Sequence, residues 1–537
     1  MSFTGTTHIS CHRLTFDWPD GSRLFDGLDL AIGPGRTGLI GVNGTGKSTL
    51  LKLIAGELTP LSGSVRVDGE VGCLAQHLPL DTTLRVDQVL GIDRTRAALH
   101  AIERGDAAEE HFAAVGDDWD IEERTRAILD QLGLGHVGLD RQVGRISGGE
   151  SVLLRLAGLL LSGPDVLLLD EPTNNLDLRA RERLYEAVRS WRGVLVVVSH
   201  DRELLERVDQ IADLREGRVI RFGGTLSAYE DALAVEQEAA ERTVRAAEAD
   251  VRRQKRELIE AHEKLAGRAR AGKKAAETAG LPKIVAGARK RAAEVSAGKH
   301  RILHEERLAE ARERLTEAES AVRDDDEIRV DLPGTAVPGR RRVLTLRELE
   351  LRNGTRADVE VLGPERIALV GANGAGKSTL LNTVAGLLEP VAGEADAHVP
   401  LRYLPQRLDV LDGELSIAEN VHALAPTARP QQVRAQLARF LFRKDTPAQR
   451  VDTLSGGERF RATLAALMLA EPAPQLLLLD EPTNNLDLAS VRQLTSALNS
   501  YQGALLVASH DLPFLRGLGI TRWLAIEEGE LTETGPR

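Results

Sequence analysis

The chain has 537 residues, 42% of them hydrophobic, and a net charge of −12. This length and composition predict a globular protein of two or more domains, and the acidic balance argues against a protein that is basic over its whole surface. The two cysteines, Cys11 and Cys73, exclude a disulfide framework and a four-cysteine iron–sulfur cluster. Because the sequence shows neither a signal-peptide layout nor an apolar run of roughly 18 residues, we expect a soluble protein of the cytoplasm.

The first element with a chemical signature is LIGVNGTGKSTLL, which begins at Leu39 and predicts a strand, a glycine loop and a helix start. Small residues in such a loop let backbone N–H groups surround a phosphate, and the helix N-terminus adds its dipole. Lys47 can reach the β- and γ-phosphates of a nucleotide, and Ser48 can hold Mg²⁺. The predicted nucleotide-binding residues here are Gly41, Asn43, Gly44, Gly46, Lys47, Ser48 and Thr49.

Two further signals follow before the next strand. Gln76 comes after a short apolar stretch. A single glutamine carries little information, and this one is a candidate for the nucleotide site only because it lies between the other motifs. The polar, alanine-rich stretch between Gln76 and Ser147 predicts helices. The segment ISGGE then places serine and two glycines before an apolar helix, which makes a second anion-seeking helix N-terminus. Its predicted nucleotide contacts are Ser147, Gly148, Gly149 and Glu150.

The segment VLLLDE predicts a buried parallel strand that ends in two carboxylates. We predict that Asp170 binds Mg²⁺, directly or through water, and that Glu171 polarises the attacking water. His200 follows a valine-rich strand and is interpreted as a contact to the γ-phosphate. The alternatives are an ion pair that caps a sheet and a structural histidine. The phosphate loop in the same copy favours the catalytic interpretation.

From residue 231 to residue 326 proline, aromatic residues and β-formers nearly vanish, which predicts two long antiparallel helices. Glycines and a proline between Ala271 and His300 predict a broken tip. From Lys264 to Arg301 eleven Lys or Arg stand against two Glu, a net charge of +9, so the rest of the chain carries −21. This basic tip indicates contact with nucleic acid, and a solvated coiled-coil hairpin is an equally weighted alternative. The predicted RNA-binding residues are Lys273, Lys274, Lys283, Arg289, Lys290 and Arg291.

The whole set of motifs then returns in the same order. The offset is 330 residues for the glycine loops, 308 for the SGGE segments, and 310 for both DEPTNNLDL and SHD. Because each copy has two phosphate-seeking loops, we expect a head-to-tail pair in which the SGGE loop of one copy closes the site of the other. The residues predicted in the second copy are Gly371, Asn373, Gly374, Gly376, Lys377, Ser378, Thr379, Gln406, Ser455, Gly456, Gly457, Glu458, Asp480, Glu481 and His510.

The motifs GxxxxGKST, Gln, SGGE, DEPTNxLD and SHD, in that order twice, resemble those of the ATP-binding cassette ATPases. Two cassettes on one chain with a helical linker between them look like the ABC-F family. The resemblance implies an α/β fold, with P-loop NTPase cassettes over residues 1–230 and 327–537 and a helical hairpin over residues 231–326. It also implies ATP hydrolysis, two ATP per chain clamped between the cassettes of a monomer, and Mg²⁺ held by Ser48, Gln76, Asp170, Ser378, Gln406 and Asp480.

In that family the linker, called the P-site tRNA interaction motif, enters the ribosomal E site. It reaches towards the P-site tRNA and the peptidyl transferase centre in 23S rRNA. The resemblance therefore predicts a ribosome-binding ATPase that protects ribosomes from antibiotics. A housekeeping translation factor and the ATPase component of a membrane transporter are the alternatives, together with a DNA-repair or chromosome ATPase, and the charged hairpin argues against the transporter.

This sequence departs from the family pattern at several positions. Both copies read TNN, with Asn175 and Asn485 where the family usually has histidine. The resemblance implies an aromatic residue that stacks on adenine before the first glycine loop; Trp18 fits, and Phe16 is the alternative. The corresponding segment of the second copy, LELRNGT, has no aromatic residue, so we expect the two sites to hold adenine differently.

Overall fold

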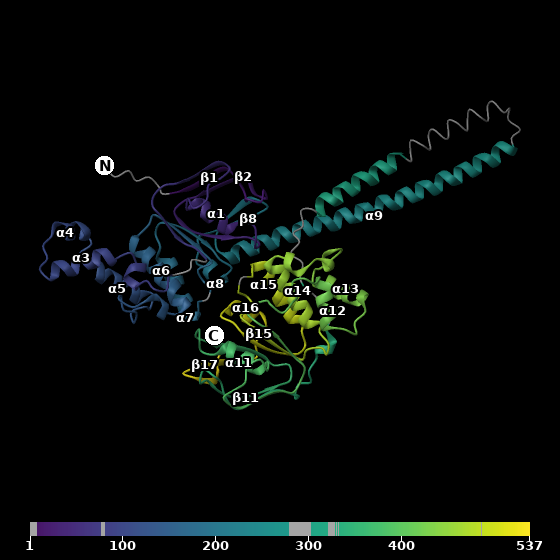
Figure 1. Cartoon of the computed structure of the whole chain (residues 1–537). Coiled ribbons are helices and arrows are strands. Elements are labelled where there is room, and N and C mark those ends of the chain that lie inside the picture. The colour runs from purple at the N-terminus through teal and green to yellow at the C-terminus, as the bar shows by residue number, and fades with distance from the viewer. Residues whose placement is uncertain are drawn as a thin grey trace. The chain divides into compact units, whose positions relative to one another are not determined.

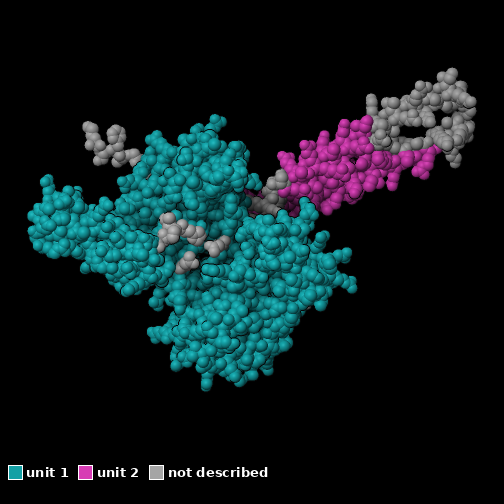
Figure 2. Space-filling view, in the orientation of Figure 1, with its two compact units in different colours: residues 1–226, 326–537 teal, residues 227–325 magenta. Residues whose placement is uncertain are grey.

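The computed structural model describes residues 8–76, 81–174, 176–278, 302–319, 328, 330, 332–484 and 486–536. The chain forms two compact units, which Figure 2 shows in different colours. One unit comprises Met1–Leu226 and Asp326–Arg537, and the other comprises Ser227–Asp325. The first unit contains both copies of the motif set, here called the first and second cassettes. The second unit contains the predicted linker.

The first cassette is built on a six-stranded sheet, parallel except for its last hairpin. In sheet order its strands are β5 (Val71–Leu74), β6 (Val166–Asp170), β7 (Val194–Val198), β3 (Gly35–Ile40), β8 (Gln210–Arg215) and β9 (Arg218–Gly223). Strands β6 and β7 are buried at every position, as expected of parallel strands covered on both faces. A separate antiparallel sheet has the order β2 (Arg23–Ile32), β1 (Ile9–Asp17) and β4 (Ser62–Val67).

Two helices of the first cassette, labelled α1 and α6 in Figure 1, start where the motifs predict. Helix α1 (Lys47–Ile54) begins at the lysine of the glycine loop, and α6 (Gly148–Ser162) begins in the SGGE segment. The alanine-rich stretch between Gln76 and Ser147 is helical, which confirms that prediction. It contains α2 (Val86–Val89), α3 (Asp93–Glu103), α4 (Glu109–Val115), α5 (Ile121–Gln131) and the 3₁₀ turn η1 (Val143–Arg145), and α7 (Leu178–Ser190) and α8 (Arg202–Leu205) follow later in the cassette.

The second cassette repeats the parallel core, but its two groups of strands join into one nine-stranded sheet. They join where Arg356 pairs with Glu530. In sheet order the strands are β13 (Ala392–Ala397), β10 (Arg342–Glu350), β11 (Arg356–Leu362), β18 (Glu530–Thr534), β17 (Arg522–Glu527), β12 (Arg366–Gly371), β16 (Ala504–Ala508), β15 (Leu476–Asp480) and β14 (Leu401–Leu404). Its helices are α11 (Lys377–Val384), α12 (Ile417–Leu424), α13 (Pro430–Arg439), α14 (Gly456–Met468), α15 (Leu488–Ser500) and α16 (Leu512–Gly517), with 3₁₀ turns η2 (Pro333–Thr335), η3 (Thr446–Ala448) and η4 (Val451–Thr453).

The second unit is a helical hairpin. Helix α9 (Leu226–Thr278) has 53 residues, and a second helical segment covers residues 302–319. An ion pair of 3.5 Å between Arg314 and Asp250 joins the two segments. No helix in the described part of the chain has both the length and the apolar character needed to cross a membrane.

The first residues of the predicted tip are helical, because α9 continues through Gly272 to Thr278, whereas residues 279–300 of that tip lie outside the described residues. A glycine costs a helix only about 1 kcal/mol, whereas a proline costs about 3 kcal/mol. The first proline after residue 231 is Pro282. Of the predicted RNA-binding residues, Lys273 and Lys274 therefore lie on α9. Lys283, Arg289, Lys290 and Arg291 lie outside the described residues.

Substituting Gly272→Ala tests whether α9 extends past residue 272. If residue 272 is helical, alanine stabilises α9 locally by about 1 kcal/mol, and amide hydrogen exchange across residues 266–278 slows by about fivefold. Gly267→Ala, earlier in the same helix, is the matched control and should slow exchange to a similar extent. Unchanged exchange in the Gly272→Ala protein alone would place the end of the helix before residue 272.

Candidate nucleotide-binding sites

The two glycine loops have closely similar backbones. Gly46 and Gly376, which precede the two lysines, have φ of 97° and 109°, in the left-handed region that favours glycine. A Cβ atom at Gly46 would lie 2.8 Å from side-chain atoms of both Leu24 and Phe25, so the loop packs at a distance that only glycine allows. Both the backbone angle and the close packing therefore require glycine at position 46.

The lysine of each loop is buried and folds back over its own loop. Lys47 Nζ donates to the carbonyl of Gly41 at 2.7 Å, and Lys377 Nζ donates to the carbonyl of Gly371 at 2.8 Å. Burial lowers the pKa of both lysines, and the catalytic glutamate predicted in the same cassette is the largest charge opposing that shift. Each loop thus holds a cation close to the backbone groups predicted to surround a phosphate.

Carboxylate and hydroxyl oxygens meet beside each loop, where β6 and β15 end. Ser48 Oγ donates to Asp170 Oδ1 at 3.1 Å. In the second cassette Tyr403 donates to Asp480 Oδ2 at 3.2 Å, while the buried Oδ1 of Asp480 finds no hydrogen-bond partner among the described residues. Burial raises the pKa of Asp480, with Ser378, Tyr403 and Lys377 opposing the rise. These oxygen atoms, one of which is buried and has no hydrogen-bond partner among the described residues, are suitable ligands for a Mg²⁺ ion.

The predicted catalytic glutamates have a strained backbone and a histidine partner. Glu171 and Glu481 have φ of 48° and 46°, which is uncommon for residues other than glycine and typical of functional sites. His200 Nε2 lies 3.4 Å from Glu171 Oε1, and His510 Nε2 lies 3.3 Å from Glu481 Oε1. The repeated geometry therefore brings together the glutamate and histidine that the sequence predicted in each cassette.

Burial dominates the protonation of these pairs. It raises the pKa of Glu171 to about 8 and that of Glu481 to about 7, and it lowers the pKa of both histidines to about 3. Lys377 and then Arg181 oppose the rise at Glu481. A neutral imidazole with one N–H can donate a hydrogen bond to a phosphate oxygen. His200 is thus suited to contact phosphate without adding charge. In the second cassette His510 Nε2 accepts a hydrogen bond from Lys377 Nζ at 2.9 Å, so this histidine also positions the lysine of its loop.

Two aspartates that the sequence analysis missed connect the cassettes. The backbone N–H of Asn43 donates to Asp487 Oδ2 at 2.9 Å, and that of Asn373 donates to Asp177 Oδ2 at 3.4 Å. Through their other carboxylate oxygen, the same aspartates cap α15 and α7. The signal was present, since each is the last acidic residue of the repeated DEPTNNLDL. Its contact with the other cassette could not be read from the sequence.

Each glycine loop opens onto a cavity. The first cavity, about 590 Å³, is lined by Trp18, Leu24, Asn43, Gly44, Gly46, Lys47, Ser48, Thr49, Gln76, Glu171, Asn174, Val198 and His200. The second, about 320 Å³, is lined by Leu176, Arg181, Asn373, Gly374, Gly376, Lys377, Ser378, Thr379, Gln406, Glu481, Asn484 and His510. The second lining includes residues of both cassettes.

The two SGGE segments form helix caps. Ser147 accepts a hydrogen bond from the Glu150 N–H at 3.2 Å, and Ser455 accepts one from the Glu458 N–H at 3.4 Å. Neither Ser147–Glu150 nor Ser455–Glu458 is among the described residues that line the two cavities. The composite site, in which each segment closes the opposite glycine loop, therefore stays a prediction.

The segments before the two glycine loops differ as expected. Trp18 is 41% exposed and lines the first cavity. Phe16 is buried, and its ring packs edge-on against the ring of Trp18, with the two centroids 5.3 Å apart. In the second cassette Asn353 Nδ2 donates to the Ala375 carbonyl at 3.0 Å, next to Gly376. No aromatic side chain is among the described residues that line the second cavity. This geometry favours Trp18 over Phe16 for stacking on a base.

Comparison with known proteins agrees with the repeated motifs. The family described as ABC transporter matches residues 25–174 and 356–484. The tylosin resistance ATP-binding protein TlrC of Streptomyces fradiae is 35% identical over 95% of this chain and 96% of its own. The probable ATP-binding protein YheS of Escherichia coli is 33% identical over 92% of this chain and 75% of its own. ABC transporter F family member 5 of Arabidopsis thaliana is 28% identical over 93% of this chain and 72% of its own.

A solved structure, that of an RNase-L inhibitor, shares the fold. It has a TM-score of 0.59 and 19% identity, and the match covers 98% of this chain and 91% of that chain. At this identity the likeness concerns the fold alone.

Replacing both glutamates, Glu171→Gln and Glu481→Gln, should leave ATP binding in place and reduce the rate of hydrolysis by at least about 100-fold. The amide keeps the size of the side chain but cannot act as the base that orients and deprotonates the attacking water. Phosphate release and equilibrium ATP binding measure the two effects separately. A double variant of exposed residues, Glu123→Gln with Glu394→Gln, is the matched control. Hydrolysis at the parent rate would remove the proposed role of the two glutamates.

Trp18→Ala should weaken ATP binding at the first site by roughly tenfold, because stacking on a base contributes about 1–3 kcal/mol. The measurement uses calorimetry on a Lys377→Ala protein, in which only the first site is expected to bind. Trp18→Phe keeps an aromatic face and should recover most of the affinity. An equal loss in a Lys47→Ala protein, which keeps only the second site, would contradict the assignment.

Proposed function

Because the chain belongs to the ABC-F family of ATP-binding cassette proteins and is an ATPase with two cassettes, we propose that ATP controls its binding to ribosomes. In this proposal the hairpin enters the ribosomal E site and acts on the P-site tRNA and the peptidyl transferase centre. The result is protection of the ribosome from an antibiotic. A housekeeping role in translation is the second candidate, since the relatives also include proteins that are named only for ATP binding.

The proposed ATPase mechanism assigns one task to each group of residues. The glycine-loop backbone and Lys47 or Lys377 bind the phosphates, and the strand-end carboxylate, with Ser48 and Gln76 or Ser378 and Gln406, holds Mg²⁺. The bound Mg²⁺ neutralises phosphate charge. Glu171 or Glu481 orients the attacking water, and the neighbouring histidine contacts the γ-phosphate. The SGGE segment of the opposite cassette completes each site.

We propose that both ATP molecules bind within a single chain. The observation that supports this is the pair of hydrogen bonds from the glycine loops to Asp487 and Asp177, since each glycine loop already contacts the opposite cassette. A ligand that orders one loop therefore acts on both cassettes. Closing the cassettes around ATP would in this way control the ribosome complex, in a monomer located in the cytoplasm.

The hairpin carries the ribosomal part of the proposal. At 1.5 Å per residue, the 53 residues of α9 span about 80 Å, more than the diameter of a small domain. The net charge of +9 between Lys264 and Arg301 lies within the linker of an otherwise acidic chain. RNA phosphates are the partner that such a charge distribution fits best. We propose domain limits of 1–230, 231–326 and 327–537 for the cassette, linker and cassette.

Replacing Gly272–Gly298 by a short Gly/Ser turn tests the role of the hairpin. We expect unchanged ATP binding, weaker co-sedimentation with ribosomes, and loss of antibiotic protection in a sensitive host. A panel of macrolides, lincosamides, streptogramins and pleuromutilins would identify the antibiotic. Unchanged co-sedimentation and unchanged protection would show that the hairpin is only a spacer.

A charge variant keeps the length of the hairpin and tests the contact itself. Glutamine at Lys273, Lys274, Lys283, Arg289, Lys290 and Arg291 should weaken ribosome binding and flatten its dependence on salt, because each lost phosphate contact reduces the salt slope by about one. Replacing six exposed arginines of the cassettes by glutamine provides the control, because it changes the net charge equally and leaves the hairpin unaltered. An unchanged salt slope in the hairpin variant would contradict a contact with RNA.

A further inference from the structure

The helices that follow the two DEPTNNLDL segments differ at one position that faces a nucleotide site. Helices α7 and α15 each have 13 residues, and each is capped by the aspartate that contacts the opposite glycine loop. With the repeat offset of 310 residues, Arg181 on α7 corresponds to Val491 on α15. Val491 is buried in the apolar core of the second cassette. One helical turn after the cap, the first cassette therefore has a cationic side chain where the second has an apolar one.

Arg181 belongs to the first cassette but lines the cavity of the second. It shares that cavity with Lys377, Glu481 and His510, the residues proposed to act on the phosphates. Among the described residues that line the first cavity, none comes from the second cassette. In the part of the chain that the structure describes, the cavities thus differ by one cation from the opposite cassette.

The Arg181 side chain is held in one place by its own cassette. Its Nη1 lies 3.3 Å from Asp201 Oδ2, and its Nε donates to the Leu176 carbonyl at 3.2 Å. Asp201 is itself fixed, since it accepts a hydrogen bond from the Tyr185 hydroxyl at 2.7 Å and caps α8. Only 12% of the Arg181 side chain is exposed. An anchored guanidinium loses little conformational entropy when it meets an anion.

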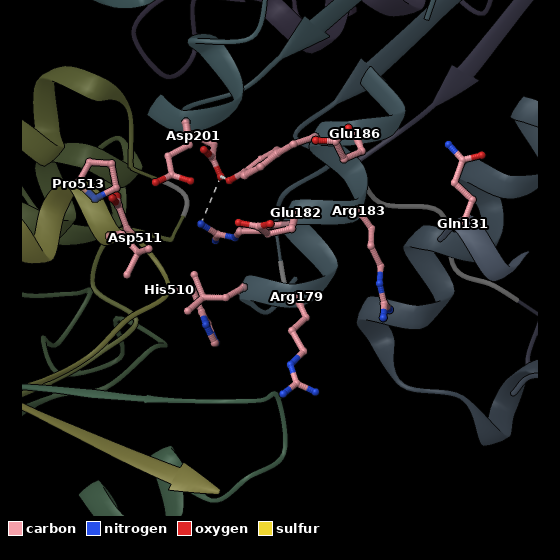
Figure 3. Close-up of a pocket in the computed structure, with 14 residues that line it drawn as sticks. Gln131, Arg179, Glu182, Arg183, Glu186, Asp201, His510, Asp511 and Pro513 are labelled. Atoms are coloured by element: carbon pink, nitrogen blue, oxygen red, sulfur yellow. Dashed lines mark hydrogen bonds and ion pairs between the residues drawn. The ribbon is translucent and has the colours of Figure 1, made fainter. Parts of the chain in front are cut away.

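The surroundings of Arg181 also allow a purely structural explanation. A third cavity, about 580 Å³, is lined by residues of both cassettes (Figure 3). Asp201 of the first cassette and Asp511 of the second both line this cavity, and burial raises the pKa of Asp511. Arg181 lines it too, so its charge could serve only to offset these carboxylates. A useful experiment must separate that role from an action on the nucleotide.

We propose that Arg181 is a residue of the second nucleotide site supplied by the first cassette, and that it favours the triphosphate over the diphosphate there. Phosphate oxygens at the lysine end of the cavity are the anions that a guanidinium fits. Because Val491 stands at the corresponding position of α15, the first site lacks this contribution. The two sites are therefore unequal in their preference for ATP. This inference rests on the proposed assignment of the two nucleotide sites.

The experiment uses two full-length single-site proteins. Lys47→Ala retains the second site, and Lys377→Ala retains the first. Arg181→Met and Arg181→Lys are introduced into each, and calorimetry measures the affinities for ADP and for a non-hydrolysable ATP analogue with Mg²⁺. In the second-site protein we expect Arg181→Met to weaken the analogue by about tenfold, as the loss of a charge-assisted hydrogen bond does, and to weaken ADP less. Arg181→Lys should recover part of the affinity.

Two further variants separate charge at the phosphates from structural support. Arg181→Met with Asp201→Asn removes the carboxylate left without its cation, so thermal stability should recover while the affinity stays low. Arg189→Ala removes an exposed arginine from the same helix and is the matched control. Recovery of affinity in the double variant, or an equal loss in both single-site proteins, would overturn the proposal.

The Lys47→Ala protein with Arg181 intact must bind nucleotide at the second site. If it binds neither ADP nor the ATP analogue, the assignment of the second site is wrong, and so is the inference. Failure of the ribosomal proposal would instead show in co-sedimentation, which this experiment does not involve.

Discussion

The hydrogen bonds from Asn43 to Asp487 and from Asn373 to Asp177 set the relation between the two cassettes on which the rest of the site depends. Each aspartate uses its second oxygen to cap the helix that follows. A single carboxylate therefore links the glycine loop of one cassette to the first turn of a helix in the other. Hydrogen bonds to charged groups contribute about 1.5–3 kcal/mol, enough for nucleotide binding at a loop to bias this contact.

Around this symmetric pair of contacts the two sites diverge. The residues proposed to carry out the chemistry are the same in both, and the distances between glutamate and histidine agree within 0.1 Å, at 3.4 and 3.3 Å. The differences lie at the edges of the cavities, where Trp18 lines one and Arg181 lines the other. With the proposed role of Arg181, the two sites share one mechanism and differ in their preference for ATP over ADP.

The hairpin is stabilised by different interactions from those that stabilise the cassettes. Most of α9 is exposed, so its stability depends on helix propensity and on ion pairs one turn apart, such as Glu241 with Arg245 at 3.0 Å and Glu248 with Arg252 at 3.5 Å. Such pairs contribute only about 0.2–0.5 kcal/mol each. A long helix that buries little apolar surface is more easily explained by a partner outside the chain than by a role in folding.

The sequence by itself determined the elements with strong local rules: the glycine loops, the strands that end in Asp170 and Asp480, the capped SGGE helices and the linker helix. These follow from backbone geometry, burial and capping, which depend on neighbours in the chain. Only the tertiary structure decided that Asp177 and Asp487 contact the opposite cassette, that Trp18 rather than Phe16 lines a cavity, and that Arg181 lines the second site. Those facts depend on residues up to 444 positions apart. No local pattern specifies such pairings, because they arise from contacts between two cassettes that are far apart in the sequence.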